Sequence, residues 1–385
     1  MHELVAIDVE GGPAFVDALR RAWDDGDAVL PVDQRLPPPA RKSLLAVARP
    51  HAIVIGDGGG GGSTLDRQPH DRTAPPMADG DALVVASSGT TGPPKLIVHT
   101  RAAVEAHARA VHGHLAVDPH RDRWLACLPL AHVGGLGVVL RAVVTDTPLD
   151  VWPGFDAARV AAAPDDLGTT LVSLVPTALD RLEASRFRWV VLGGSADSVA
   201  RPGNVVHTYG LTETGGGVVY EGEPLPSVEV RIGTGDSIFL RGPMLARGVR
   251  GPDGAVRSIT DDDGWLATGD LGRQGADGHL VVSGRADDLI VTGGENVWPE
   301  QVEAVLSVHP WVAEVAVIGR ADPEWGQRVV AVVVPVDQAA PPSLEDLRDQ
   351  VRTVLPAYAA PRELVVVDHL PRTGLGKIRR HRLGI

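Results

Sequence analysis

A chain of 385 residues can bury a large core, and we expect it to divide into two or more domains. Its net charge of −13 excludes a generic nucleic-acid binder, because phosphate backbones require a basic face. The composition, 44% hydrophobic and 22% charged, is that of a folded soluble protein. One cysteine rules out an internal disulfide and fits a reducing cytoplasm; Cys127 lies in the apolar run WLACLPL, which predicts a buried structural thiol.

Neither a signal peptide nor a membrane span is expected. The start, MHELVAIDVEGG, carries acids in its apolar stretch and lacks a basic region before it. The stretch HVGGLGVVLRAVV is interrupted by Arg141 and rich in glycine, whereas a span needs about 20 apolar residues. We therefore predict a cytoplasmic protein that does not insert into membranes.

The first functional segment follows a glycine-rich stretch, GDGGGGGST at 56–64, which cannot nucleate a helix or strand. Residues 82–88, ALVVASS, predict a short buried strand that runs into SSGTTGPPK at 87–95. The alanine-rich segment TRAAVEAHARAVHGHLAV then predicts a helix with Thr100 as its N-cap. A strand, a glycine-rich loop and a helix in this order indicate a phosphate-binding loop.

The remaining elements predict an α/β fold with two domains. Strands and helices alternate up to about residue 210, which favours a core with ligands at the carboxyl ends of the strands. The predicted strands are 123–128, 169–175, 188–194 and 204–210, with helical segments such as PTALDRLEAS between some of them. Residues 225–283 read as a β-rich subdomain. The helices PEQVEAVLSVHP and SLEDLRDQVRTVL and the strands EVAVIG, RVVAVVVP and ELVVVD predict a small, mobile α+β domain, so we place the boundaries at 1–284 and 285–385.

SSGTTGPPK is not a Walker A loop. In that motif Ser or Thr follows the lysine, whereas Leu96 follows Lys95 here, and two prolines remove backbone donors. A P-loop phosphotransferase is thereby excluded. The hydroxyls, N–H groups and one ammonium suit a pyrophosphate that must later leave. A glycine- and threonine-rich turn in solvent is the alternative interpretation.

Three later stretches offer complementary groups. In HTYGLTET, Tyr209 can stack on a purine, Thr212 can reach a phosphate and Glu213 can hold Mg²⁺. In GWLATGDLG, Asp270 can accept the two hydroxyls of a ribose, although an Asp-Gly turn is the commoner meaning. In PRTGLGKIRR, Lys377 lies in a glycine-flanked loop, and a nucleic-acid or membrane-surface tail is disfavoured because the basic run is short.

Taken in order, these stretches resemble the adenylate-forming superfamily of acyl- and aryl-CoA ligases, luciferases and peptide-synthetase adenylation domains, over most of residues 82–380. The resemblance implies that SSGTTGPPK grips the β,γ-phosphates of ATP, that LGGS lies along adenine, and that Glu213 holds Mg²⁺. The implied ATP-binding residues are Ser87, Ser88, Gly89, Thr90, Thr91, Gly92, Lys95, Gly193, Gly194, Ser195, Tyr209, Gly210, Thr212, Asp270 and Arg285.

The resemblance also implies two half-reactions at one site. Lys377 would bridge the carboxylate and the α-phosphate during adenylation, with Thr212 and His132 also in the catalytic set. Asp287 would be the hinge about which the C-terminal domain swings. The second state would form a tunnel for the thiol of coenzyme A from Gly293, Gly294, Glu295 and Asn296. ATP, Mg²⁺ and coenzyme A are the implied cofactors and co-substrates.

Within the superfamily, the chain is similar to the o-succinylbenzoate–CoA ligases of menaquinone biosynthesis. Few residues precede the phosphate loop, and PKLIVHT, LPLAHVGGLGVVLRA and GGENVWPEQVE match their pattern. His132 would then border the acyl pocket, with a packed core histidine as the alternative. The implied partner is 2-succinylbenzoate, whose second carboxylate must be recognised; Arg101, His107 and Arg141 are candidates for this contact.

Three alternatives stay open. The first is a CoA ligase for another carboxylic acid, and the second is an adenylation domain that serves a carrier protein, which we do not expect because the chain stops soon after Lys377. The third is a non-catalytic nucleotide-binding protein of the same fold, disfavoured because Glu213, Asp270, Arg285 and Lys377 are all retained. We expect no nucleic-acid partner, and a homodimer is compatible with the sequence.

Overall fold

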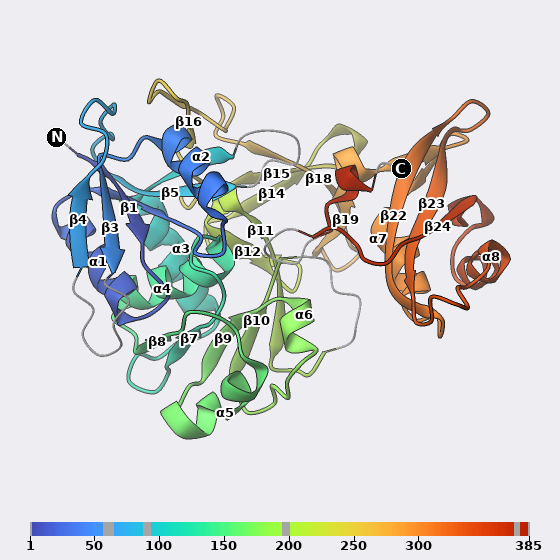
Figure 1. The fold of residues 1–385 in the computed structure, drawn as a ribbon, viewed down its shortest axis with the longest axis horizontal. Coiled ribbons are helices and arrows are strands. Elements are labelled where there is room, and N and C mark those ends of the chain that lie inside the picture. The colour runs from blue at the N-terminus through green and yellow to red at the C-terminus, as the bar shows by residue number, and fades with distance from the viewer. Residues whose placement is uncertain (1, 57–64, 88–93, 195–200, 373–377, 384–385) are drawn as a thin grey trace. The chain divides into compact units, whose positions relative to one another are not determined.

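The computed structural model describes residues 2–56, 65–87, 94–194, 201–372 and 378–383 (Figure 1). The chain divides into two compact units. The first comprises Met1–Arg231, Phe239–Ala267 and Ala276–Leu280, and the second comprises Ile232–Ile238, Thr268–Gly275 and Val281–Ile385. In the part of the chain that the structure describes, no helix is long and apolar enough to cross a membrane.

An eight-stranded sheet opens the first unit, in the order β17-β16-β6-β5-β2-β1-β3-β4. Strands β1, β2, β3 and β5 are parallel, and the others join antiparallel. The strands are β1 (Leu4–Asp8), β2 (Ala28–Pro31), β3 (Ala52–Gly56), β4 (Leu65–Pro69), β5 (Asp81–Ser87), β6 (Lys95–Thr100), β16 (Gly248–Arg250) and β17 (Val256–Arg257). Helices α1 (Pro13–Asp24) and α2 (Pro38–Ala48) connect the first strands.

A second sheet of seven strands has the order β13-β12-β11-β10-β9-β7-β8 and is parallel from β11 to β8. Its strands are β7 (Trp124–Ala126), β8 (Leu149–Val151), β9 (Leu171–Leu174), β10 (Trp189–Leu192), β11 (Val205–Leu211), β12 (Gly216–Tyr220) and β13 (Glu223–Pro224). The central parallel strands β7, β9 and β10 are almost continuously apolar because both faces of such a sheet are covered. The helices of this part are α3 (Arg101–His114), α4 (Val133–Thr145), α5 (Ala157–Leu167) and α6 (Pro176–Leu179).

Helices α3 and α4 join the two sheets into one core (Figure 1). Val111 of α3 and Leu136 of α4 pack in the same cluster as Leu83 of β5 and Trp124 of β7. Burying such side chains stabilises by about 1.5–3 kcal/mol each. The shared core therefore includes residues of β5, β10 and β11, the strands whose carboxyl ends carry predicted site residues.

A four-stranded sheet has the order β14-β15-β18-β19, as the short apolar runs between residues 225 and 283 predict. Its strands are β14 (Glu229–Ile232), β15 (Ser237–Arg241), β18 (Leu266–Gln274) and β19 (Leu280–Arg285). The 3₁₀ turn η3 (Ala286–Asp288) follows directly.

The last sheet lies in the second unit, in the order β21-β20-β23-β22 with β24 paired to β23. Its elements are β20 (Ile290–Thr292), β21 (Glu295–Val297), α7 (Pro299–Leu306), β22 (Val312–Asp322), β23 (Gly326–Pro335), α8 (Leu344–Arg352) and β24 (Glu363–Val366). Both helices pack on one face of this sheet, through Val302 and Leu347 among others. On the other face, Leu370 and Leu383 pack against Val330. The mixed α/β fold with a separate C-terminal α+β part is the predicted class.

Two local predictions differ from the structure. The helix after the phosphate loop does begin at Thr100, whose side chain accepts a hydrogen bond from the N–H of Ala103 at 3.1 Å. However, β6 precedes it, because Leu96–Val98 pair with both β5 and β16. The helix expected over 176–185 stops at Leu179 and continues as turns, and the Asn204 amide donates to the carbonyls of Ala184 and Phe187 in that segment.

Candidate functional site

The two stems of the predicted phosphate loop are paired strands. Ser87 ends β5 and lies opposite Lys95, which begins β6 and is exposed. Antiparallel pairing brings the stems together, as a tight phosphate-binding turn requires. The loop residues Ser88, Gly89, Thr90, Thr91 and Gly92 lie outside the described residues, as do Ser195 and Lys377.

Predicted nucleotide residues gather at the carboxyl ends of two parallel neighbours, β10 and β11. Leu192 pairs with His207, so Gly193 and Gly194 leave the sheet beside the end of β11, where Tyr209 and Gly210 lie. A Cβ on Gly210 would overlap the carbonyl oxygen of Gly216. Only glycine therefore permits the close approach of β12 to β11 that shapes this edge.

The turn η1 (Thr212–Thr214) follows β11 and carries two predicted ligand residues, Thr212 and Glu213. The buried Thr214 hydroxyl accepts from the N–H of Leu211 at 2.8 Å and lies 2.6 Å from the carbonyl of Gly216. The backbone carbonyl of Glu213 accepts from the N–H of Ala246 at 2.8 Å. The turn is thus held rigidly, while the Thr212 and Glu213 side chains are half-buried and open to a ligand.

His99 is a residue of this site that the sequence analysis missed. Its Nε2 lies 2.8 Å from the carbonyl oxygen of Thr212, and the side chain is fully buried in β6. Burial lowers the pKa of His99 to about 4, against a raising effect of the hydrogen bond. The imidazole is therefore neutral at pH 7 and donates from Nε2. A histidine in an otherwise apolar strand, KLIVHT, was the available signal.

His132 stands immediately before α4 and has an acidic partner. Its Nε2 lies 3.3 Å from Oδ2 of Asp33, which follows β2. Burial would raise the pKa of the Asp33 carboxyl, but hydrogen bonds from His132 and Arg35 outweigh it and hold that pKa well below its usual range. His132 is about a quarter exposed, and an ionised carboxylate orients it, which a histidine merely packed in a core would not need.

Arg141 is buried in α4 and has no acidic partner among the described residues. Its Nη2 donates to Oγ of Ser173 at 3.1 Å, its Cζ lies 4.7 Å from the Trp124 ring centroid, and its Nε has no hydrogen-bond partner. A buried guanidinium without a carboxylate is costly. Arg141 also lines a small cavity with His99, His107, Gly137, Gly215 and Met244. This cavity has a volume of only about 10 Å³, room for about one water, and the guanidinium at its wall has no carboxylate partner among the described residues.

Two of the three candidates for a second carboxylate contact meet at this cavity. His107 is buried there, with Nε2 3.0 Å from the carbonyl of Gly217, and burial lowers its pKa to about 3, so it is neutral. Arg101 does not line the cavity. It forms a 3.0 Å ion pair with Glu105 and lies 3.9 Å from the Trp23 ring centroid.

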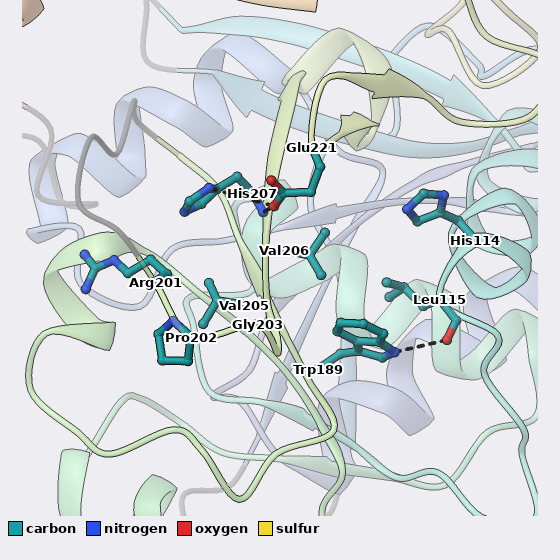
Figure 2. A pocket seen from close by; sticks show the side chains of 10 residues that line it. All are labelled: His114, Leu115, Trp189, Arg201, Pro202, Gly203, Val205, Val206, His207 and Glu221. Carbon is teal, nitrogen blue, oxygen red and sulfur yellow. Dashed lines mark hydrogen bonds and ion pairs between the residues drawn. The ribbon is translucent and has the colours of Figure 1, made fainter. Parts of the chain in front are cut away.

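A second cavity, of about 450 Å³, borders the strand that carries Tyr209 (Figure 2). His207 of β11 lines it, together with His114 from the end of α3, Trp189 of β10 and Glu221 after β12. Figure 2 shows the Trp189 indole donating to the carbonyl of Leu115, a contact of 3.2 Å. The carboxylate of Glu221 accepts from the backbone N–H of His207, so this wall is polar.

In the second unit, Asp270 and Arg285 form an ion pair across β18 and β19, with Nη1 3.0 Å from Oδ1. Asp270 is 4% exposed, its backbone N–H donates to Oγ1 of Thr268, and the contact with Arg285 orients its carboxylate. The structure thus joins two predicted nucleotide residues that are 15 positions apart in the sequence. Arg285 is half-exposed and can turn toward a ligand.

The remaining predicted residues of this unit lie in two turns. Asp287 is in η3, exposed to solvent. Gly293 and Gly294 connect β20 to β21 with φ of 61° and 84°, and Thr292 pairs with Glu295. Two positive φ values are what a two-residue hairpin of type I′ requires, and a Cβ on Gly293 would also meet the Trp325 ring at 2.7 Å. Glu295 and Asn296 follow on the exposed strand β21.

Cys127 is buried, and burial raises its pKa to about 12, as expected for a structural thiol. No three side chains of His, Cys, Asp or Glu gather to hold a metal ion within the described ranges. Mg²⁺ commonly uses one or two carboxylates together with phosphate oxygens and water. Glu213 at the open end of β11 fits that requirement.

The model of the family described as AMP-binding enzyme matches residues 2–248, and that of the AMP-binding enzyme C-terminal domain matches residues 301–377. A probable 2-succinylbenzoate–CoA ligase of Mycobacterium tuberculosis is 39% identical over 379 residues, covering 91% of this chain and 93% of the relative. The solved structure of o-succinylbenzoate CoA synthetase MenE from Bacillus subtilis, in complex with the acyl-adenylate intermediate OSB-AMP, is similar with a TM-score of 0.84 at 25% identity. The match covers 100% of this chain and 88% of the MenE chain. Wild-type MenE from E. coli, with a bound phenylether-linked analogue of OSB-AMS, has a TM-score of 0.71 at 28% identity. That match covers 99% of this chain and 87% of the E. coli chain.

Proposed function

This chain belongs to the AMP-binding enzyme family, and we propose that it is an ATP-dependent CoA ligase that converts 2-succinylbenzoate into 2-succinylbenzoyl-CoA in menaquinone biosynthesis. The similarity to relatives that act on this acid supports the reaction. The observation that supports 2-succinylbenzoate as the acid concerns Arg141. This buried cation lies at a cavity and has no acidic partner in the described part of the chain. An aromatic acid with a second carboxylate supplies the missing charge.

The reaction needs two steps because a carboxylate is a poor electrophile. In the first, a carboxylate oxygen of the acid attacks the α-phosphorus of ATP, and pyrophosphate leaves. In the second, the thiol of coenzyme A loses its proton and attacks the acyl carbon, and AMP leaves. Mg²⁺ neutralises phosphate charge in the first step. Both steps gather negative charge, so fixed cationic and hydrogen-bonding groups accelerate them.

We assign the nucleotide contacts by position. The loop residues Ser87–Gly92 and Lys95 hold the β,γ-phosphates, Gly193–Ser195 lie along adenine and Tyr209 stacks on it, with Gly210 at the bend of the strand. Thr212 contacts phosphate and Glu213 holds Mg²⁺. Asp270 accepts the ribose hydroxyls, with Arg285 beside it. The ion pair of Asp270 with Arg285 supports this, because it orients the carboxylate before the ribose arrives.

We assign the acid contacts to the first unit. His132, oriented by Asp33, borders the acyl group. Arg141 pairs with the carboxylate that is not activated, while Lys377 bridges the other carboxylate and the α-phosphate. Arg101 is not part of this assignment, because Glu105 already neutralises it.

We further propose that the functional domains are residues 1–284 and 285–385, with Asp287 as the hinge between the two half-reactions. Gly293, Gly294, Glu295 and Asn296 then line the path of the thiol, and their exposure on a tight hairpin supports a surface role. The net charge of −13 and the single cysteine support action in the cytoplasm on small molecules and not on nucleic acid. A homodimer is compatible with this function.

The test is acid-dependent release of AMP with ATP, Mg²⁺ and coenzyme A, across 2-succinylbenzoate, benzoate, medium-chain fatty acids and amino acids. We expect strong preference for 2-succinylbenzoate. Turnover only with another acid would keep the mechanism and reject the menaquinone role. No AMP from any acid would reject catalysis and favour a nucleotide-binding protein of the same fold.

A further inference from the structure

Arg380 lies at the centre of a cluster of three carboxylates in the second unit. Its Nη2 contacts both carboxylate oxygens of Glu303, at 2.7 and 2.9 Å, and Oε1 of Glu300 at 3.2 Å. Its Nη1 lies 3.5 Å from Oδ2 of Asp288. The Arg380 side chain is only 20% exposed, so these contacts are weakly screened by solvent.

The partners of Arg380 come from separate segments. Asp288 ends η3, directly after the proposed hinge residue Asp287, whereas Glu300 and Glu303 lie on α7. Oε1 of Glu303 also accepts from the N–H of Val317 in β22 at 2.7 Å. One arginine therefore joins the hinge turn, a helix and the sheet of the unit.

Arg380 follows Lys377 by three positions, and the stem of that segment is closed. Arg372 and Ile378 form an antiparallel bridge, and the N–H of Arg379 donates to the carbonyl of Pro371 at 2.8 Å. Ile378 and Leu383 pack into the apolar cluster on the sheet. The Arg380 cluster adds a charged anchor that ties this stem to α7 and to η3.

The cluster holds three carboxylates and one guanidinium, so the charge of Arg380 is what offsets the repulsion among Asp288, Glu300 and Glu303. Burial raises the pKa of Glu300, and its Oε2 has no hydrogen-bond partner. Removing a buried ion-pair partner leaves uncompensated charge and is strongly destabilising locally. The stem after Lys377 would then lose its fixed place relative to the hinge turn.

We propose that Arg380 is a positioning residue for the proposed catalytic Lys377: it anchors the segment that begins at Ile378, one position after the lysine, to α7 and to the turn after Asp287. This inference rests on the proposed function, because it presupposes that Lys377 acts in adenylation. It predicts an effect on one half-reaction only.

The experiment compares R380Q and R380K with the wild type in each half-reaction, using whichever acid the wild type activates. Adenylation is measured as acid-dependent exchange of pyrophosphate into ATP, and thiolation as capture of a supplied acyl-adenylate by coenzyme A. We expect R380Q to lose about 10²-fold in adenylation, the typical cost of a misplaced catalytic group, and to keep thiolation within about twofold. R380K, which retains the charge, should recover part of the adenylation rate.

Two further variants separate positioning from stability. R379Q makes the same charge change one residue away, at a side chain with no ion pair within the described ranges, and should leave both half-reactions unchanged. In a K377A background R380Q should cost nothing more, since its effect passes through the lysine. Equal losses in both half-reactions, or a further loss in the K377A background, would overturn the proposal. Inactivity of the wild type with every acid would instead reject the proposed function.

Discussion

The imidazole of His99 donates a 2.8 Å hydrogen bond from Nε2 to the backbone carbonyl of Thr212, and so joins β6 to the turn that carries Glu213. β6 begins at Lys95, which ends the predicted phosphate loop. One buried side chain therefore connects the stem of the phosphate loop to the proposed Mg²⁺ ligand. Because burial lowers the pKa of His99 to about 4, this donor is present throughout the neutral range.

We predict that H99L slows adenylation and weakens the apparent binding of Mg²⁺. Leucine leaves the Thr212 carbonyl without its donor, at a cost of about 1–3 kcal/mol, and frees the turn that presents Glu213. The apparent Mg²⁺ affinity should fall several-fold. H99Q, whose amide can donate from nearly the same place, is the matched control and should retain most activity. Equal Mg²⁺ dependence in H99L and the wild type would contradict the role of His99.

We predict that D33N acts on the acid through His132. The neutral amide no longer stabilises the imidazole by charge, so the orientation of His132 should relax and the KM for the acid should rise. Steady-state kinetics would measure this rise, with the KM for ATP as the internal control. D33N and H132A should be non-additive, because the two side chains are in direct contact. Additive effects would show that Asp33 acts independently of His132.

We predict that R141M discriminates between acids. Loss of the guanidinium removes the partner of the second carboxylate, and truncating one side of a buried charge pair costs about 2–5 kcal/mol. The value of kcat/KM for 2-succinylbenzoate should fall accordingly, whereas benzoate, which lacks that carboxylate, should be affected little. Methionine is similar in length and apolar, so the Trp124 contact is largely kept. A uniform decrease for both acids would indicate that Arg141 only supports the core.

We predict that the first unit loses stability as the pH falls from about 6.5 toward 4. Burial lowers the pKa of His99 to about 4, of His107 to about 3 and of His112 to about 4. Below pH 6.5 the unfolded chain therefore binds protons that the folded chain does not, and each histidine can contribute up to about 1.4 kcal/mol per pH unit. Thermal denaturation at pH 7.5, 6.5 and 5.5 would measure this.

The double variant H99Q/H107Q is the control for this pH dependence. Its midpoint should vary less between pH 6.5 and 5.5 than that of the wild type, whatever its absolute stability. Asp33 does not contribute to this pH dependence. Its folded-state pKa is held below the usual carboxyl range, so the stability that it provides is lost only when the pH falls into that range, well below 5.5. An unchanged slope in the double variant would contradict the assignment to these histidines.

Much of the fold could be predicted because the responsible patterns are local. The apolar runs of β7, β9 and β10 have the composition of strands buried on both faces. Thr100 caps α3 as predicted, and the amphipathic pattern of SLEDLRDQVRTVL identified the helix α8. In contrast, no elements were predicted for residues 1–55, where β1, β2 and β3 lie.

The sequence by itself determined the family, the order of the motifs and the chemistry of the groups that they carry, because hydroxyls, carboxylates and glycines at these spacings have few other uses. Only the tertiary structure decided which distant residues meet. Asp33 reaches His132 across 99 positions, and His99 reaches Thr212 across 113. The physical reason is that such pairs depend on strand order and on the shared core between two sheets, which no short stretch of sequence encodes.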